Sequence, residues 1–345
     1  MPQDIHFAIP FPARRNPDAE RARAVHLDWP RKLGLITTDA AAERHRKGDY
    51  ADLACWFYPA ATGSDLDLGV DLMSWFFLFD DLFDGPAGDD PALARQLTEA
   101  VIAAVERPLD DSSPLIARGL ADIWRRTCEG MSEDYRARAA RHWRGYIAGY
   151  VDEAASRHRA VPYDSGRYLA IRRKTIGVLP TVDMAERTSH CEVPKRIYES
   201  AVMSAMLQIA IDINVLFNDI ASLEKEAARG EQNNMVLILM RENGWTQARS
   251  ISHMQKEVRT RLEQLVLLES LLPQVYDSFD LNAEERDRTE RFRTDGLRTV
   301  IRGSHDWHRS SGRYGAEFVL AAKQEGYLED LGYRRMTRTS QISGR

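Results

Sequence analysis

The 345-residue sequence predicts an all-α protein, and three observations carry this prediction. Apolar residues recur at helical spacing along nearly the whole chain. No convincing β-hairpin signal or run of alternating strand residues accompanies them. Helix start and stop residues fall where the periodicity begins and ends. The predicted helices cover, in order, residues 38–48, 66–84, 91–105, 114–129, 133–158, 166–176, 194–229, 234–243, 246–271 and 282–311.

Capping residues support most of these helices in turn. Asp, Asn, Ser and Thr side chains accept hydrogen bonds from the first N–H groups of a helix, and Pro is tolerated in its first turn. The start signals are Asp65, Asp90-Pro91, Ser113-Pro114, Ser132, Ser165, Thr246 and Asn282. Glycine commonly ends a helix, and the stop signals are Gly85-Pro86, Gly230 and Gly244.

The domain organisation is predicted to be simple. Connections between the predicted helices are short, and neither a low-complexity linker nor an internal repeat divides the chain. We therefore expect a single helical domain over residues 1–333, preceded within it by an extended arm over residues 1–20. Residues 334–345 form a tail rich in Arg, Thr and Ser that is expected to be disordered.

Composition narrows the classes of protein. The formal net charge is −5 with both signs mixed along the chain, so no basic face indicates nucleic acid. The three cysteines show neither metal-ligand spacing nor a disulfide framework, which suits a reduced cytoplasm. No signal peptide is recognisable, and the apolar stretch 201–217 contains Asp212 and is not expected to span a membrane. No obligate protein partner is implied, and the oligomeric state stays open.

A first acidic cluster consists of Asp80, Asp81 and Asp84, directly after an aromatic run over residues 75–79. On one helix these positions lie at about 0°, 100° and 40°, so Asp80 and Asp84 share a face. Carboxylates in a last helical turn oppose the helix dipole and repel one another unless a cation binds them. The cluster therefore indicates a Mg²⁺ site, with a solvated acidic helix end as the alternative.

A second cluster places an amide, a hydroxyl and a carboxylate at Asn218, Ser222 and Glu226. Their i, i+4, i+8 spacing puts them at about 0°, 40° and 80° on one helix, where they can converge on one divalent ion. Lys225 and Arg229 flank them at about −20° and 20°, as an anionic ligand of the metal would require. The alternative is a turn at Asn218 followed by a solvated charged face.

These motifs resemble those of the class I terpene synthases. The family's aspartate-rich motif matches residues 80–84, its N-D-x-x-S-x-x-K-E motif matches 218–226, and its C-terminal Arg-Tyr pair matches Arg313 and Tyr314. Arg172 has the separation of the family's diphosphate-sensing arginine, with Arg173 the weaker candidate. The strings at 67–86 and 298–314 resemble one bacterial cyclase of the family in particular, and that likeness extends from residue 1 to about 333.

The resemblance implies a fold, a reaction and a set of roles. It implies a helical bundle around a deep apolar cavity, farnesyl diphosphate as substrate, and three Mg²⁺ ions that hold the diphosphate. The chain has no second DDxxD motif, so cyclisation is favoured over chain elongation. The predicted site residues are Asp80, Asp84, Asn218, Ser222 and Glu226 for metal, Arg157, Arg172, Lys225, Arg229, Arg313 and Tyr314 for diphosphate, and Phe76, Phe77, Trp307 and His308 for the pocket wall.

Three points stay open on the sequence alone. Asp81 is expected to lie behind the metal ligands, and the alternative is a direct metal contact. His308 is placed in the wall, and either it or the released diphosphate could accept the final proton. The alternatives to the predicted reaction are another sesquiterpene product, a diphosphate hydrolase with a wet pocket, and a non-catalytic helical binding module.

Overall fold

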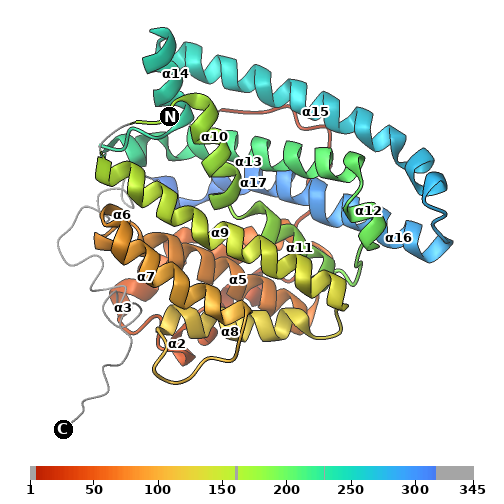
Figure 1. The fold of residues 1–345 in the computed structure, drawn as a ribbon, viewed down its shortest axis with the longest axis horizontal. Coiled ribbons are helices and arrows are strands. Elements are labelled where there is room, and N and C mark those ends of the chain that lie inside the picture. Colours follow the sequence, from red (N-terminus) through yellow and green to blue (C-terminus); the bar gives the residue numbers. More distant parts are fainter. Residues whose placement is uncertain (1–4, 160–161, 229, 316–345) are drawn as a thin grey trace. The chain divides into compact units, whose positions relative to one another are not determined.

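A computed structural model describes residues 5–159, 162–228 and 230–315 (Figure 1). Every regular element in these ranges is a helix and none is a strand, which confirms the all-α prediction. Residues 5–16 carry no regular secondary structure. The tail over 334–345 lies outside the described residues. Two compact units are present: the N-terminal unit contains 18–54, 63–159 and 311–315, and the C-terminal unit contains 5–17, 55–62, 162–228 and 230–310.

In the N-terminal unit, α5 is the core helix. Its own residues are apolar and buried on nearly every side. It packs against α8, and its aromatic rings pack against those of α9. Trp75 in its middle is fully buried and donates its indole N–H to the carbonyl of Ile116 at 2.8 Å. The elements of this unit are α1 (Ala19–Val25), α2 (Asp28–Lys32), α3 (Asp39–Gly48), most of α4 (Tyr50–Phe57), α5 (Gly63–Leu82), α6 (Pro86–Asp89), α7 (Pro91–Ile102), η2 (Ala103–Val105), α8 (Leu115–Cys128), α9 (Glu133–Arg159) and η4 (Gly312–Tyr314).

In the C-terminal unit, α13 is the central helix and packs against α15, α17, α10, α14 and α11. It is long and apolar enough to cross a membrane by length and composition, with mean hydropathy 1.5, but 61% of that window is buried inside the structure, as in a core helix. The elements are α10 (Ser165–Thr175), α11 (Val178–Thr188), α12 (Lys195–Tyr198), α13 (Ala201–Ala228), α14 (Met235–Asn243), α15 (Gln247–Ser278), α16 (Ala283–Phe292), the π-helical η3 (Arg293–Leu297) and α17 (Arg298–Ser310).

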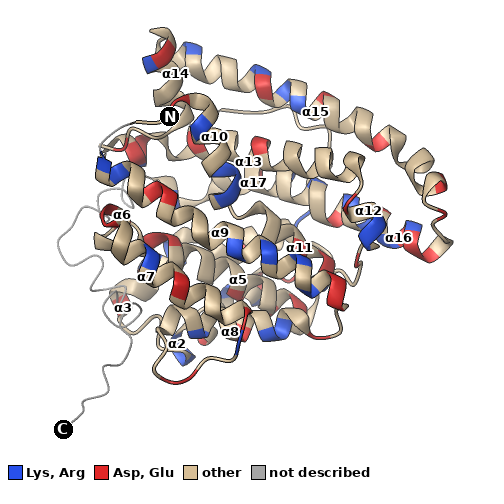
Figure 2. Cartoon of the chain, viewed as in Figure 1, with Lys and Arg blue, Asp and Glu red and all other residues tan. Residues whose placement is uncertain are grey.

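Most predicted helices are present, and several caps are confirmed. Asp90 accepts from two backbone N–H groups of α7, Thr246 caps α15, and Asn282 forms a full capping box with Glu285 at α16. Charges of both signs are spread along the helices, as the mixed sequence pattern indicates (Figure 2).

The differences have local causes. The predicted helix 194–229 is two helices, because Ser200 accepts the N–H of Met203 and begins α13 anew. The predicted helix 282–311 is interrupted by η3. Helices α1, α2, α4, α6 and α11 were not predicted. The first four have at most eight residues each, and the Pro180 and β-branched residues of α11 conceal its periodicity. Proline is nevertheless tolerated in a first turn, and α11 starts directly after Gly177, whose φ is +75°.

Candidate active site

The first acidic cluster lies where α5 ends, but its third residue, Asp84, lies beyond the end of the helix. Asp80 and Asp81 occupy the last turn, and the helix stops at Leu82. Two i→i+3 hydrogen bonds then tighten the chain. The N–H of Phe83 donates to the carbonyl of Asp80, and the N–H of Asp84 donates to the carbonyl of Asp81. The prediction that Asp84 belongs to the helix is therefore wrong, because the tightened turn before Pro86 ends it two residues earlier. Asp84 is exposed in this turn.

A buried arginine holds the other two carboxylates. Arg313 of η4 donates through Nη2 to Oδ2 of Asp80 at 3.2 Å and to Oδ1 of Asp81 at 3.1 Å, and through Nη1 to the hydroxyl of Tyr50 at 2.7 Å. The side chains of Arg313 and Asp81 are 2% and 7% exposed, whereas that of Asp80 is 46% exposed. Asp81 is thus committed to the arginine, and Asp80 keeps an accessible carboxylate.

The two aromatic residues of α5 face different neighbours. Phe77 stacks on Tyr50 with ring centroids 4.0 Å apart, and the guanidinium of Arg313 lies 4.5 Å from its ring. Phe76 packs against Trp143 and Tyr146 of α9 at 5.5 and 5.1 Å. Both rings therefore have structural partners inside the N-terminal unit, and their role in a pocket wall stays a prediction.

Arg157 of α9 supports the turn after the aspartates. Its Nη1 donates to the carbonyl of Phe83 at 2.7 Å, and its Nη2 lies 3.7 Å from Oε2 of Glu153. A Cβ on Gly88 would lie 1.9 Å from that carbonyl and 2.1 Å from Nη1, so only glycine permits this close packing. Arg157 thus contacts the turn that follows Asp80 and Asp81, and its expected contact with diphosphate stays a prediction.

The second cluster lies on one uninterrupted helix. Asn218, Ser222 and Glu226 all belong to α13, so the alternative of a turn at Asn218 is wrong. The hydroxyl of Ser222 donates its proton to the carbonyl of Asn218 at 2.8 Å, which leaves the lone pairs of Oγ available. Oε2 of Glu226 accepts from Nδ2 of Asn234 at 2.9 Å.

Arg172 reaches this cluster from α10. Its Nη2 donates to Oδ1 of Asn218 at 2.8 Å and its Nη1 to Oγ1 of Thr175 at 3.3 Å. The neighbouring Asp219 is fully buried and accepts from the hydroxyl of Tyr168 at 3.0 Å and from the N–H of Met235 at 2.8 Å. Burial raises the pKa of Asp219 above its usual range, against the opposing charge of Arg172. Asp219 therefore ties α10 and α14 to α13 and is not a free ligand.

His308 of α17 orients the amide of Asn218. Its Nδ1 lies 2.6 Å from the carbonyl of Ser304, an acceptor, so Nδ1 carries a proton. In the neutral ring Nε2 is then an acceptor, and it lies 3.4 Å from Nδ2 of Asn218. This contact directs Oδ1 of Asn218 away from the histidine. Trp307, next to it, is 1% exposed.

The remaining predicted residues are placed as follows. Lys225 lies on α13 and is 7% exposed, and Tyr314 lies in η4 and is 4% exposed. Arg229 lies outside the described residues. In the described part of the chain no three His, Cys, Asp or Glu side chains gather into a metal site. The hard oxygens of Asn218, Ser222 and Glu226 nevertheless fit a Mg²⁺ ion that completes its shell with water and phosphate oxygens.

Sequence reasoning missed the residues that support these groups. Tyr150 donates its hydroxyl to Oδ1 of Asp80 at 3.2 Å, and Asn234 donates to Oε2 of Glu226. Tyr50 and Tyr168 act one step further out: Tyr50 accepts from Arg313, and Tyr168 donates to Asp219. Only Asn234 carries a local signal, as a cap before an apolar run. The tyrosines have none, because each reaches its partner only through tertiary packing.

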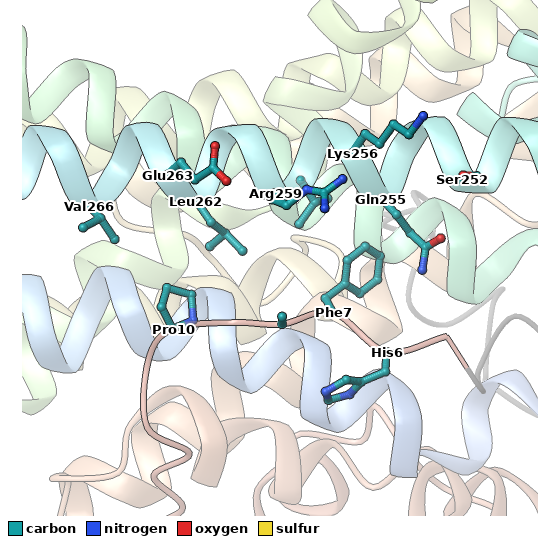
Figure 3. Close-up of a pocket in the computed structure, with 12 residues that line it drawn as sticks. His6, Phe7, Pro10, Ser252, Gln255, Lys256, Arg259, Leu262, Glu263 and Val266 are labelled. Carbon is teal, nitrogen blue, oxygen red and sulfur yellow. The ribbon is translucent and has the colours of Figure 1, made fainter.

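A separate hollow of about 700 Å³ lies in the C-terminal unit between residues 6–10 and α15 (Figure 3). Phe7, Pro10, Leu262 and Val266 supply much of its apolar lining, and none of the predicted site residues lines it. It is therefore distinct from both clusters.

Comparisons with known proteins agree with the motifs. The family described as "Terpene synthase family 2, C-terminal metal binding" matches residues 71–264. Pentalenene synthase of Streptomyces avermitilis is 69% identical over 96% of this chain and 99% of its own length, and that of Streptomyces exfoliatus is 67% identical over the same shares. The structure of linalool/nerolidol synthase from Streptomyces clavuligerus, in complex with 2-fluorogeranyl diphosphate, has a TM-score of 0.79 at 34% identity, covering 89% of this chain and 99% of that one.

Proposed function

Because this chain belongs to the terpene synthase family, we propose that it is a magnesium-dependent sesquiterpene cyclase that converts farnesyl diphosphate to pentalenene and diphosphate. The observation that supports this product is a sequence identity of 66–69% to three pentalenene synthases over 96% of the chain. The (-)-beta-caryophyllene synthase of Saccharothrix espanaensis is only 37% identical. Another sesquiterpene product is the main alternative, because a modest change of pocket contour redirects a reactive cation.

The proposed binding step rests on two groups of side chains. Asp80 and Asp84 would hold metal on one wall, and Asn218, Ser222 and Glu226 would hold the remaining ion of an expected three. Bound Mg²⁺ supplies Lewis-acid stabilisation of the negative charge that develops on the leaving diphosphate. Oxygen is the only ligand atom in both groups, which is the preference of this cation.

Cationic and phenolic groups of the chain would bind the diphosphate itself. This role is assigned to Arg172, Lys225, Arg313 and Tyr314, and also to Arg157 and Arg229. Guanidinium groups suit bidentate contacts to phosphate oxygens. Arg172 supports the assignment by already donating to Oδ1 of Asn218, so its charge lies at the second cluster.

The pocket wall must keep water from the allylic cation that remains. Phe76, Phe77 and Trp307 are the proposed aromatic wall, and each suitably placed ring would add about 0.5–2 kcal/mol of cation–π stabilisation. His308 has its Nδ1 proton directed at the carbonyl of Ser304 and its Nε2 at Asn218, which supports an orienting role for this ring more than that of a base. The final proton acceptor is then the released diphosphate.

One experiment tests the proposal. The purified protein is incubated with farnesyl, geranyl and geranylgeranyl diphosphate, each with and without Mg²⁺, and the products are analysed by gas chromatography and mass spectrometry. Pentalenene from farnesyl diphosphate, only with Mg²⁺, is the expected result. A different sesquiterpene would overturn the proposal that the product is pentalenene. Farnesol as the sole product would favour a diphosphate hydrolase, and no response to Mg²⁺ would favour a non-catalytic binding module. A cytoplasmic location and a place in a pentalenolactone-type antibiotic pathway stay predictions.

A further inference from the structure

Two adjacent arginines of α10 have different partners on α13. Arg172 donates one hydrogen bond to Oδ1 of Asn218 at 2.8 Å. Arg173 instead makes a bidentate pair with Asp212, from Nε to Oδ1 at 2.8 Å and from Nη2 to Oδ2 at 2.9 Å. Bidentate guanidinium–carboxylate pairs are among the strongest and most directional polar contacts in proteins. The last turn of α10 is therefore attached to α13 through both residues, but more firmly through Arg173.

Asp212 is a buried carboxylate held by several hydrogen bonds within the C-terminal unit. It is 5% exposed and lies six residues before Asn218 on the same helix. Besides Arg173, its carboxylate accepts from Nε2 of Gln208 at 3.0 Å and from Nε of Arg261 on α15 at 3.4 Å. Four hydrogen bonds thus satisfy one buried carboxylate and connect three helices, α10, α13 and α15 (Figure 1).

The contact of Arg172 is of a different kind. Its acceptor, Oδ1 of Asn218, is also the oxygen that would face the metal, and its guanidinium would turn to diphosphate when substrate binds. That contact must therefore weaken or rearrange during each cycle. The hydroxyl of Tyr168 holds the preceding turn of α10 to Asp219 at 3.0 Å. The last turn needs an attachment of its own that does not change.

We propose that the Arg173–Asp212 pair is this attachment, and that both are positioning residues which hold α10 in place so that Arg172 can bind diphosphate. The inference rests on the proposed function, because it takes diphosphate to be the ligand of Arg172. It gives Arg173 a role distinct from that of the sensing arginine beside it.

The test measures binding of inorganic diphosphate by titration calorimetry with excess Mg²⁺, and the KM and kcat for farnesyl diphosphate. R173K keeps the charge but loses the bidentate fork, and D212N keeps the shape but loses the charge. Each variant should weaken diphosphate binding and raise KM about fivefold, which corresponds to about 1 kcal/mol. Because both act through one contact, the double variant should lose less than the product of the two single effects.

A matched control comes from the same unit. Arg196 makes two hydrogen bonds of 2.7 Å to Glu285, and its side chain is 43% exposed, against 37% for Arg173. R196K should leave diphosphate affinity within about twofold of the wild type. The inference is overturned if R173K and D212N bind diphosphate normally, or if R196K weakens binding as much as they do. A wild type that binds diphosphate but makes no terpene would refute the proposed function and leave this test intact.

Discussion

Removal of the buried guanidinium of Arg313 should destabilise the protein even without metal or substrate. In Arg313→Met, the carboxylate of Asp81 loses its ion pair while its side chain stays 7% exposed, and the hydroxyl of Tyr50 loses its donor. Breaking a buried pair by removing one partner costs up to about 3–5 kcal/mol, because the remaining carboxylate loses its buried cation. The 46% exposed Asp80 should add less than about 1 kcal/mol.

This effect can be separated from any loss of activity. The free energy of unfolding is measured by urea denaturation followed by circular dichroism, in the absence of Mg²⁺ and diphosphate. The double variant Arg313→Met/Asp81→Asn removes the buried negative charge as well, and should recover most of the lost stability. A loss below about 1 kcal/mol in the single variant, or no recovery in the double, would refute the reasoning that the buried charge of Asp81 depends on Arg313.

Three further outcomes are expected. Replacing Asn218 and Ser222 together by alanine should reduce turnover at least about a hundredfold with circular dichroism unchanged, since both supply ligands more than core volume; near-normal activity would exclude a metal site on α13. Phe76→Ala and Phe77→Ala should lower the rate and broaden the product mixture seen by gas chromatography, and an unchanged product profile would contradict a role in the pocket wall. Burial lowers the pKa of His45 to about 3, so the unfolded chain binds a proton that the folded chain does not between about pH 6.5 and 3. The stabilisation that comes from keeping His45 neutral is complete above that range and falls by up to about 1.4 kcal/mol per pH unit on acidification. Urea denaturation at pH 7, 6 and 5 should show this decrease in the free energy of unfolding. An equally steep decrease in His45→Asn would argue against it.

The sequence by itself determined the helical class, most helix positions and the membership of the two predicted ligand clusters. These are local properties, because helical periodicity and i, i+4 spacing are visible within one or two turns. Asn218, Ser222 and Glu226 could be placed on one face for this reason. Asp84 could not be placed correctly, because the exact end of a helix depends on how the following turn packs.

Only the tertiary structure decided which charges meet. Arg313 reaches Asp81 across 232 residues of sequence, His308 reaches Asn218 across 90, and Arg173 reaches Asp212 across 39. No local pattern marks these pairs, since a partner is selected by the packing of whole helices and by the cost of burying a charge without a partner. The helices carry the predicted ligands, and the long-range hydrogen bonds decide which of these side chains are committed to the protein and which are left accessible.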